Sequence, residues 1–173
     1  MMEMTVSQLT VDPFTNMPIL ILKSGDQALP IWIGLLEASA IATELEKVAL
    51  DRPMTHDLLK NLIAESGLKV ECVEIHDVKE NTFYACIRLT GPRKKEIALD
   101  ARPSDAIALA LRTGARIRVA KKVVERMRKI DLGVSKVDDK KSLALGGVSL
   151  KDAARLRELL ENLTDDHFGK WKM

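Results

Sequence analysis

The segment Ile97–Val119, IALDARPSDAIALALRTGARIRV, constrains the fold more than any other part of the chain. A short apolar run at 97–99 predicts a buried strand, and the alanine-rich run at 106–111 favours helix. Gly114 stands where a left-handed helix C-cap is wanted, and 115–120 has the pattern of a second strand. We therefore predict a strand–helix–strand unit in the core, with its two strands parallel.

The corner between the first of these strands and the helix is unusually polar. Asp100 ends the strand, and Arg102 precedes a proline that disfavours both further extension and helix before it. Ser104 is the predicted N-cap of the helix, and Asp105 places negative charge at its positive end. The pattern indicates a polar, anion-friendly corner beside a helix N-terminus.

Residues 52–57, RPMTHD, repeat this chemistry earlier in the chain. Arg52 precedes a proline, Thr55 is the predicted cap, and Asp57 lies in the first turn of a helix that Gly67 should end. The repetition indicates either a duplicated unit or the same capping solution used twice. Because each corner has an arginine, it favours a shared polar site.

Elsewhere the pattern is mainly that of strands. An amphipathic helix is predicted at 35–50, with Glu37 in its first turn, where a carboxylate either suits the helix dipole or serves a site. The fold class predicted is α+β, with a mixed, largely antiparallel sheet packed with helices and a C-terminal amphipathic helix. Strands are expected at 3–11, 17–23, 28–33, 68–76 and 82–89.

Three parts are predicted along the chain. Residues 1–132 form the folded domain, and the polar stretch 133–148 is a linker or surface loop. Residues 149–173 are a C-terminal helix and tail, whose apolar stripe needs a surface to pack on. Its own domain or a partner subunit would supply that surface.

Composition restricts the classes of function. The chain has 46% hydrophobic and 30% charged residues, which is typical of a soluble globular protein. With 3% aromatic residues, stacking on single-stranded bases is poorly supplied. No apolar run approaches the roughly 20 residues that cross a membrane. Cys72 and Cys86 are expected to be free thiols in a reducing, cytoplasmic setting.

Positive charge is concentrated in one stretch, from Arg116 to Lys129. It holds seven basic residues against Glu125 alone. Such a cluster either attracts nucleic acid by charge and counterion release or is a solvated face without a partner. The candidate substrate-binding residues in it are Arg116, Arg118, Lys121 and Lys122.

Three blocks together resemble the bifunctional nuclease family: LPIWIGLLEASAIATEL at 29–45, RPMTHDLL at 52–59 and LDARPSDAIALALR at 99–112. The resemblance covers about residues 4 to 130. It implies an α+β fold with a mixed sheet, self-association and, for some plant members, nuclease activity on RNA and DNA. It carries over the positions Glu37, Arg52, Thr55, His56, Asp57, Asp100, Arg102, Ser104 and Asp105.

These residue types suit phosphodiester hydrolysis, which needs an activated water and stabilised phosphoryl charge. Carboxylates that hold Mg²⁺ or Mn²⁺ activate the water, and arginines stabilise part of the phosphoryl charge. A histidine can be the general acid or base. The candidate catalytic residues are Glu37, His56, Asp57, Asp100 and Asp105, of which Asp57, Asp100 and Asp105 would bind the metal. Arg52, Arg102 and Ser104 would bind substrate.

The residues themselves leave three functions open. The first is a metal-dependent nuclease of low sequence specificity acting on RNA or DNA. The second is a non-catalytic module that binds nucleic acid or another anionic ligand. The third is a self-assembling scaffold whose arginines fasten helix starts to the sheet. In each case we expect a homo-oligomer, because apolar strands and few aromatics leave patches that a second copy would cover.

Overall fold

The computed structural model describes residues 1–92 and 96–134. Within them a single mixed sheet has the strand order β3-β2-β1-β7-β4-β5-β6. The predicted α+β class is confirmed; the C-terminal helix lies outside the described residues. The elements are β1 (Met2–Val11), β2 (Pro18–Ser24), β3 (Gln27–Trp32), α1 (Leu35–Leu45), α2 (Thr55–Glu65), β4 (Lys69–Lys79), β5 (Thr82–Thr90), β6 (Glu96–Ala101), α3 (Pro103–Thr113), β7 (Arg116–Val119) and α4 (Lys121–Val134).

The predicted strand–helix–strand unit is β6–α3–β7. The prediction of a buried strand at 97–99 is wrong, because β6 is an edge strand of the sheet and is mostly exposed. Strand β7 pairs parallel with β4 and antiparallel with β1, so it joins the two halves of the sheet. Helix α3 is buried along most of its length, with Ile107 and Leu109 fully inaccessible. It ends at Gly114, whose φ of 67° is the left-handed cap conformation. This helix is therefore the centre of the core, as the sequence predicted.

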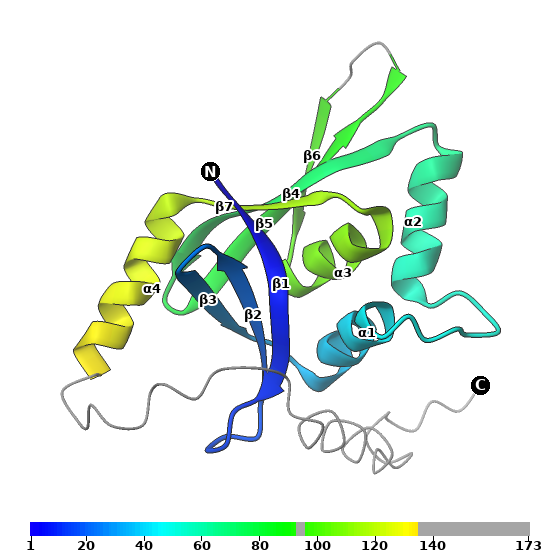
Figure 1. Ribbon diagram of the computed structural model, residues 1–173. Coiled ribbons are helices and arrows are strands. Elements are labelled where there is room, and N and C mark those ends of the chain that lie inside the picture. Colours follow the sequence, from blue (N-terminus) through cyan, green and yellow to red (C-terminus); the bar gives the residue numbers. More distant parts are fainter. Residues whose placement is uncertain (93–95, 135–173) are drawn as a thin grey trace.

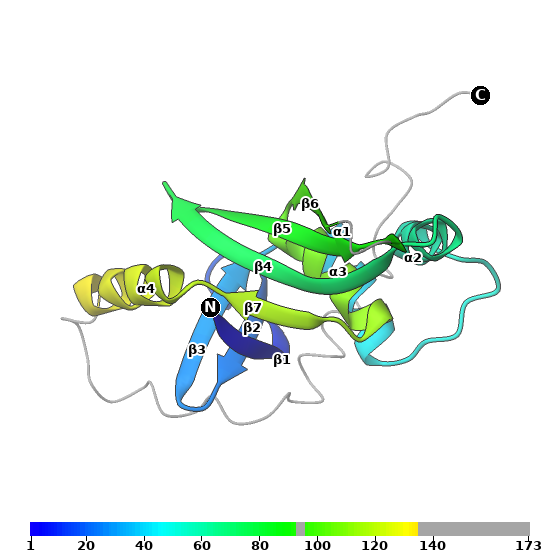
Figure 2. The same ribbon diagram turned by 90° about the horizontal axis from the view of Figure 1, so that it is seen from above.

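Helices α1, α2 and α3 lie together on one side of the molecule, and α4 lies at the opposite end (Figures 1 and 2). Both α1 and α2 pack on α3, whereas α4 contacts β4 and β3. Strand β3 and the turn between β4 and β5 line one pocket, although they are far apart in the strand order. The sheet is therefore curved, and its N-terminal half turns back towards β5.

Local predictions differ from the structure mainly at element ends. The helix predicted to run to residue 50 ends at Leu45, and Lys47 adopts a φ of 52° that an α-helix does not accommodate. The connection between the predicted strands 68–76 and 82–89 is shorter than the five residues that the prediction leaves between them. Strand β4 continues to Lys79, and only Glu80 and Asn81 turn, both with positive φ. That two-residue turn matches the twist of the long β4–β5 ribbon.

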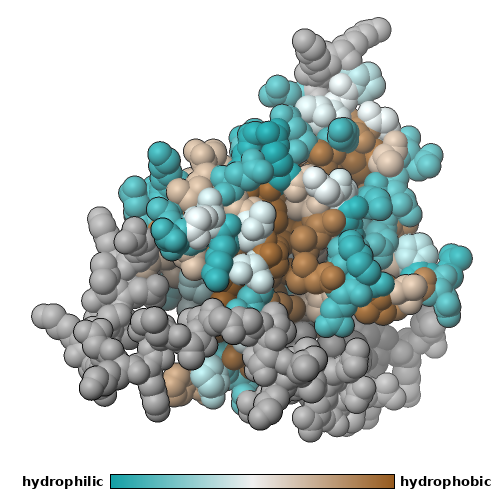
Figure 3. Space-filling model, in the orientation of Figure 1, coloured by the Kyte–Doolittle hydropathy of each residue, from teal (hydrophilic) through white to brown (hydrophobic). Residues whose placement is uncertain are grey.

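Apolar surface gathers where β1, α1 and α3 meet, and Figure 3 shows it as the brown centre of that face. A pocket of about 350 Å³ lies there, with Met4, Leu45, Ala110 and Ile117 in its wall. Glu3 and Arg116 are the charged residues that line it. No helix among residues 1–92 and 96–134 has the length and apolar character that a membrane span requires.

Candidate functional site

The start of α3 positions the central arginine of the site. Arg102 is the N-cap in extended conformation, and Pro103 occupies the first helical position, where its missing N–H is harmless. Ser104 is thus not the N-cap that the sequence predicted, but the second residue of the helix. Asp105 follows at N3, where the Arg102 side chain folds back onto it with Nε–Oδ2 and Nη2–Oδ1 distances of 2.7 and 3.1 Å.

Residues from the two other helices complete a cluster around Arg102. Its Nη1 donates to Oε1 of Glu37, in the first turn of α1, at 2.7 Å. Nε2 of His56, in the first turn of α2, lies 3.3 Å from Oδ1 of Asp105. The chain of contacts Glu37–Arg102–Asp105–His56 therefore joins the first turns of three helices, and we call these four residues the acid–base cluster.

The electrostatics of the cluster hold its carboxylate ionised. Partial burial acts to raise the pKa of Asp105, but hydrogen bonds from Arg102 and His56 outweigh it, so that pKa lies below its ordinary value. The same hydrogen bonds and charges of Asp105 and Glu37 raise the pKa of Arg102. His56 is only 14% exposed at its side chain, whereas Arg102 is 65% exposed. A partly sheltered imidazole and an accessible guanidinium thus share one carboxylate.

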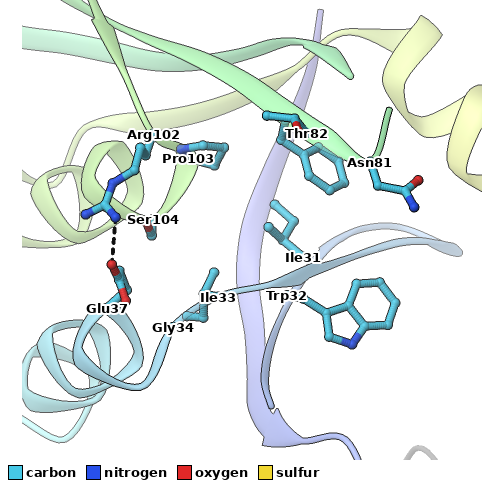
Figure 4. A pocket seen from close by; sticks show the side chains of 11 residues that line it. Ile31, Trp32, Ile33, Gly34, Glu37, Asn81, Thr82, Arg102, Pro103 and Ser104 are labelled. Carbon is cyan, nitrogen blue, oxygen red and sulfur yellow. Dashed lines mark hydrogen bonds and ion pairs between the residues drawn. The ribbon is translucent and has the colours of Figure 1, made fainter. Parts of the chain in front are cut away.

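Two pockets flank the acid–base cluster. One, of about 370 Å³, lies between α1 and α2 and is lined by His56, Asp105 and Thr55. The other, of about 290 Å³, lies between β3, the β4–β5 turn and the start of α3, and is lined by Ser104, Asn81 and Trp32 (Figure 4). We call them the His56 pocket and the Ser104 pocket. Glu37 and Arg102 line both.

Asp57 of the second corner has a different role from Asp105 of the first. Oδ1 of Asp57 accepts from Nε of Arg112 at 2.8 Å, and its Oδ2 accepts from the Met54 backbone N–H at 3.0 Å. Met54, and not Thr55, is the N-cap of α2. The Arg112 side chain is 2% exposed and also donates to the Ala108 carbonyl. Asp57 therefore fastens α2 to α3, and sequence reasoning overlooked its partner Arg112.

Two other predicted site residues lie apart from the cluster. Asp100 is exposed on β6, opposite Cys86 of β5, and it lines neither flanking pocket. Arg52 is exposed in the connection between α1 and α2 and lines neither pocket either. The predicted polar site shared by the two corners is therefore present in part: the first corner contributes Arg102 and Asp105, and the second contributes His56 but not its arginine.

The residues present do not fit the predicted three-aspartate metal site. Asp57 binds Arg112, Asp105 binds Arg102, and Asp100 stands on a different element. Throughout residues 1–92 and 96–134, no group of three or more His, Cys, Asp or Glu residues is arranged to hold a metal ion. We therefore assign no chemical step to a metal held by these three residues.

The predicted basic residues form a separate surface. Arg116 and Arg118 alternate along β7 with the buried Ile117 and Val119, and Lys121 and Lys122 begin α4 exposed. Lys122 pairs with Asp77 at 3.1 Å. None of the four lines the His56 or Ser104 pocket. They could contact a long anionic ligand but do not contribute to the acid–base cluster.

Comparison with known proteins places the acid–base cluster within a matched domain. The model of the bifunctional nuclease domain matches residues 19–131, which include all four residues of the acid–base cluster. The chain belongs to the bifunctional nuclease domain family. The resemblance predicted from the three sequence blocks is thereby confirmed.

Relatives of two kinds match the chain. A Mycobacterium tuberculosis protein described as uncharacterized is 37% identical over 168 residues, which are 96% of this chain and 97% of that protein. Bifunctional nuclease 1 of Oryza sativa subsp. indica is 27% identical over 57% of this chain and 30% of its own length. Bifunctional nuclease 2 of Arabidopsis thaliana is 28% identical over 61% of this chain and 33% of its own length. The matched region is thus about a third of each plant protein.

Proposed function

We propose that this bifunctional nuclease domain hydrolyses phosphodiester bonds of RNA or DNA, with low sequence specificity, in the His56 pocket. The observation that carries the proposal is the acid–base cluster: an accessible arginine, an ionised carboxylate and a sheltered histidine in contact at the wall of one pocket. The plant relatives named as bifunctional nucleases support the class of reaction.

Each residue has a defined role in this proposal. Asp105 orients the imidazole of His56, which removes a proton from water or gives one to the leaving oxygen. Arg102 offers its guanidinium to the phosphoryl oxygens, where charge develops during displacement. Thr55, at the start of α2, lines the pocket and can donate to the same oxygens. The residues thereby supply a proton-transfer group and an anion-stabilising group side by side.

Single variants test the roles. His56→Gln should reduce cleavage of single- and double-stranded substrates by about 10²- to 10⁴-fold, the contribution typical of a general acid or base. His76→Gln is a matched control, because His76 is exposed on β4 and lines neither flanking pocket. Equal cleavage by both variants and the wild type would contradict the assignment to His56.

A requirement for Mg²⁺ or Mn²⁺ is a separate proposal. This proposal rests on the general chemistry of phosphodiester cleavage. It does not rest on the site, because the predicted aspartates are not assembled to bind a metal ion. We expect chelation with EDTA to abolish cleavage and added Mg²⁺ or Mn²⁺ to restore it. Undiminished cleavage after exhaustive chelation would restrict the reaction to the side chains of the acid–base cluster.

The basic surface at β7 and the start of α4 supports a second candidate, nucleic-acid binding without turnover. Arg116 is exposed at the start of β7, and Lys121 and Lys122 are exposed at the start of α4. Exposed basic side chains are the usual partners of nucleic-acid phosphates. Binding should weaken as salt rises, with a slope that falls when Lys121 is replaced by glutamine. Salt-sensitive binding together with no cleavage by the wild type would favour this candidate over the nuclease.

We also propose that copies of the chain associate through α1 and α2. Half of the large exposed apolar side chains of the described residues fall in this region: Leu36, Leu45, Val48, Leu50, Leu58 and Leu62. Leu58 and Leu62 are 62% and 60% exposed and one helical turn apart. Light scattering should give the mass of a dimer or larger for the wild type and a smaller mass for Leu58→Glu/Leu62→Glu. A wild-type monomer at micromolar concentration would refute association.

A further inference from the structure

The Ser104 pocket lies beyond the acid–base cluster and is not used by the proposed chemistry. The Glu37–Arg102 ion pair forms the boundary between it and the His56 pocket, because these two residues line both. Figure 4 shows this pair at one end of the Ser104 pocket and Trp32 with Asn81 at the other. A ligand that passed Arg102 would therefore enter a second pocket, whose lining is partly polar and partly apolar.

Two helix N-termini meet at this pocket. Gly34, the N-cap of α1, and Arg102, the N-cap of α3, both line it, and neither helix has a side-chain cap. Within the described ranges, the N–H groups of Leu36 and Ser104 in the first turns make no hydrogen bond. Unpaired N–H groups at helix N-termini favour an anion, and here two such ends converge.

Ser104 provides an independent observation that points to a ligand. The residue is 7% exposed and lines the pocket, yet its hydroxyl has no hydrogen-bond partner among residues 1–92 and 96–134. The hydroxyl oxygen itself keeps accessible surface, since no buried side-chain oxygen or nitrogen of the described residues lacks a partner, and the rest of the residue is covered by protein. Its position in the pocket wall leaves it free to donate to a bound oxygen.

An internal carboxylate already occupies part of this anion position. The side chain of Glu37 folds over the N-terminus of α1 so closely that a Cβ on Gly34 would overlap its Oε2. Its Oε1 accepts from Arg102 at 2.7 Å. Glu37 thus holds the place, next to a helix end and a guanidinium, that an incoming anion would take.

We propose that the Ser104 pocket binds a phosphate group, which displaces the carboxylate of Glu37 from Arg102 and accepts a hydrogen bond from Ser104. The source of the group would be a terminal phosphate or a phosphodiester adjacent to the bond held in the His56 pocket. For that source the inference rests on the proposed function. The pocket itself can bind inorganic phosphate whether or not cleavage occurs.

The test measures binding of inorganic phosphate to the full chain by calorimetry, at ionic strength matched with chloride. Ser104→Ala should weaken binding roughly tenfold, as expected for losing a hydrogen bond to a charged group. Glu37→Gln should strengthen binding, because the competing negative charge is gone while the side chain keeps its shape. Ser39→Ala is the matched control, since Ser39 is a helical serine that lines only the His56 pocket.

The melting temperature without phosphate checks folding, and Ser104→Ala should leave it nearly unchanged because the hydroxyl has no partner to lose. Short oligonucleotides with a 5′-phosphate, a 3′-phosphate or hydroxyl ends distinguish the two sources of the group. If the pocket binds a terminal phosphate, one of the phosphorylated oligonucleotides should bind more tightly than the one with hydroxyl ends. If it binds an internal phosphodiester, the three oligonucleotides should bind with the same affinity. In both cases Ser104→Ala should weaken the binding. Unchanged affinity in Ser104→Ala, or weaker phosphate binding in Glu37→Gln, would overturn the proposal without affecting the result for His56.

Discussion

The ion pair between Asp57 and Arg112 provides the sharpest test of what the second arginine–proline corner does. If Asp57 were a metal ligand, neutralising it would relieve charge repulsion and leave the fold intact or more stable. In the structure it is the partner of an arginine whose side chain is 2% exposed. Asp57→Asn should therefore destabilise the protein, because it leaves the buried guanidinium of Arg112 without a countercharge.

The magnitude follows from the burial of the two partners. Removing one member of a buried ion pair typically costs about 3–5 kcal/mol. Asp57 itself is 33% exposed, and an asparagine oxygen still accepts one hydrogen bond. We therefore expect a loss nearer 2–3 kcal/mol, which corresponds to about 4–12 °C in melting temperature for a chain of this length.

The measurement is urea unfolding of Asp57→Asn with Asp51→Asn as the matched control. Asp51 is exposed in the loop before α2, so its replacement should change stability by less than about 0.5 kcal/mol. Arg112→Met should lower the free energy of unfolding less in the Asp57→Asn variant than in the wild type, because the two residues form one interaction. Equal costs in both backgrounds would refute the pairing.

The pH dependence follows from the same contacts. Burial acts to raise the pKa of Asp57, but hydrogen bonds from Arg112 and Met54 outweigh it and place the pKa below its ordinary value of 3.8. A carboxyl with a depressed pKa stabilises the fold fully above its ordinary value and progressively less as pH falls through its pKa in the folded protein. The free energy of unfolding of the wild type should thus exceed that of Asp57→Asn by a constant amount near pH 6–7. This difference should shrink below about pH 4. A margin that grew on acidification would refute the reasoning.

Three further predictions concern stability. Leu109→Ala, in the inaccessible centre of α3, should cost about 2–5 kcal/mol in denaturant unfolding, and a loss under about 0.5 kcal/mol would mean that α3 is not the core. Gly114→Ala should lower stability by about 1–2 kcal/mol, because alanine is strained at a φ of 67°; an unchanged melting curve would contradict the left-handed cap. Asp105→Asn should cost no more than about 1 kcal/mol, since its partner Arg102 is 65% exposed, while cleavage falls sharply; a loss as large as that of Asp57→Asn would make Asp105 structural instead.

Local patterns in the sequence predicted most of the fold. Strand β1 and helix α3 were predictable because their patterns, polar–apolar alternation and an alanine-rich run, are visible within a few consecutive residues. The end of α3 was predictable because Gly114 adopts a left-handed conformation easily. The end of α1 was mispredicted because the apolar spacing continues through Val48, although that residue is 48% exposed. Periodicity alone does not tell a face that packs on the core from one that is open to solvent or to a partner.

The site was predicted only in part, for a physical reason. Glu37 and Arg102 are far apart in the chain, and the sequence cannot show that α1 and α3 begin side by side. Arg112 carries the one detectable signal that was overlooked: a charge on a helix face where its neighbours Ala108 and Leu109 are fully buried apolar residues. A charge in such a place needs a partner, which is Asp57.

The two corners show why similar sequences can separate into different roles. Both place an aspartate at the third position of a helix, where negative charge is favourable. Asp57 forms an ion pair with a buried arginine of α3, and this pair holds α2 against α3. Asp105 meets an arginine that is 65% exposed and a histidine that lines a pocket. The accessibility of the partner arginine, which packing decides and spacing does not, therefore separates the aspartate that stabilises the fold from the aspartate that takes part in the candidate site.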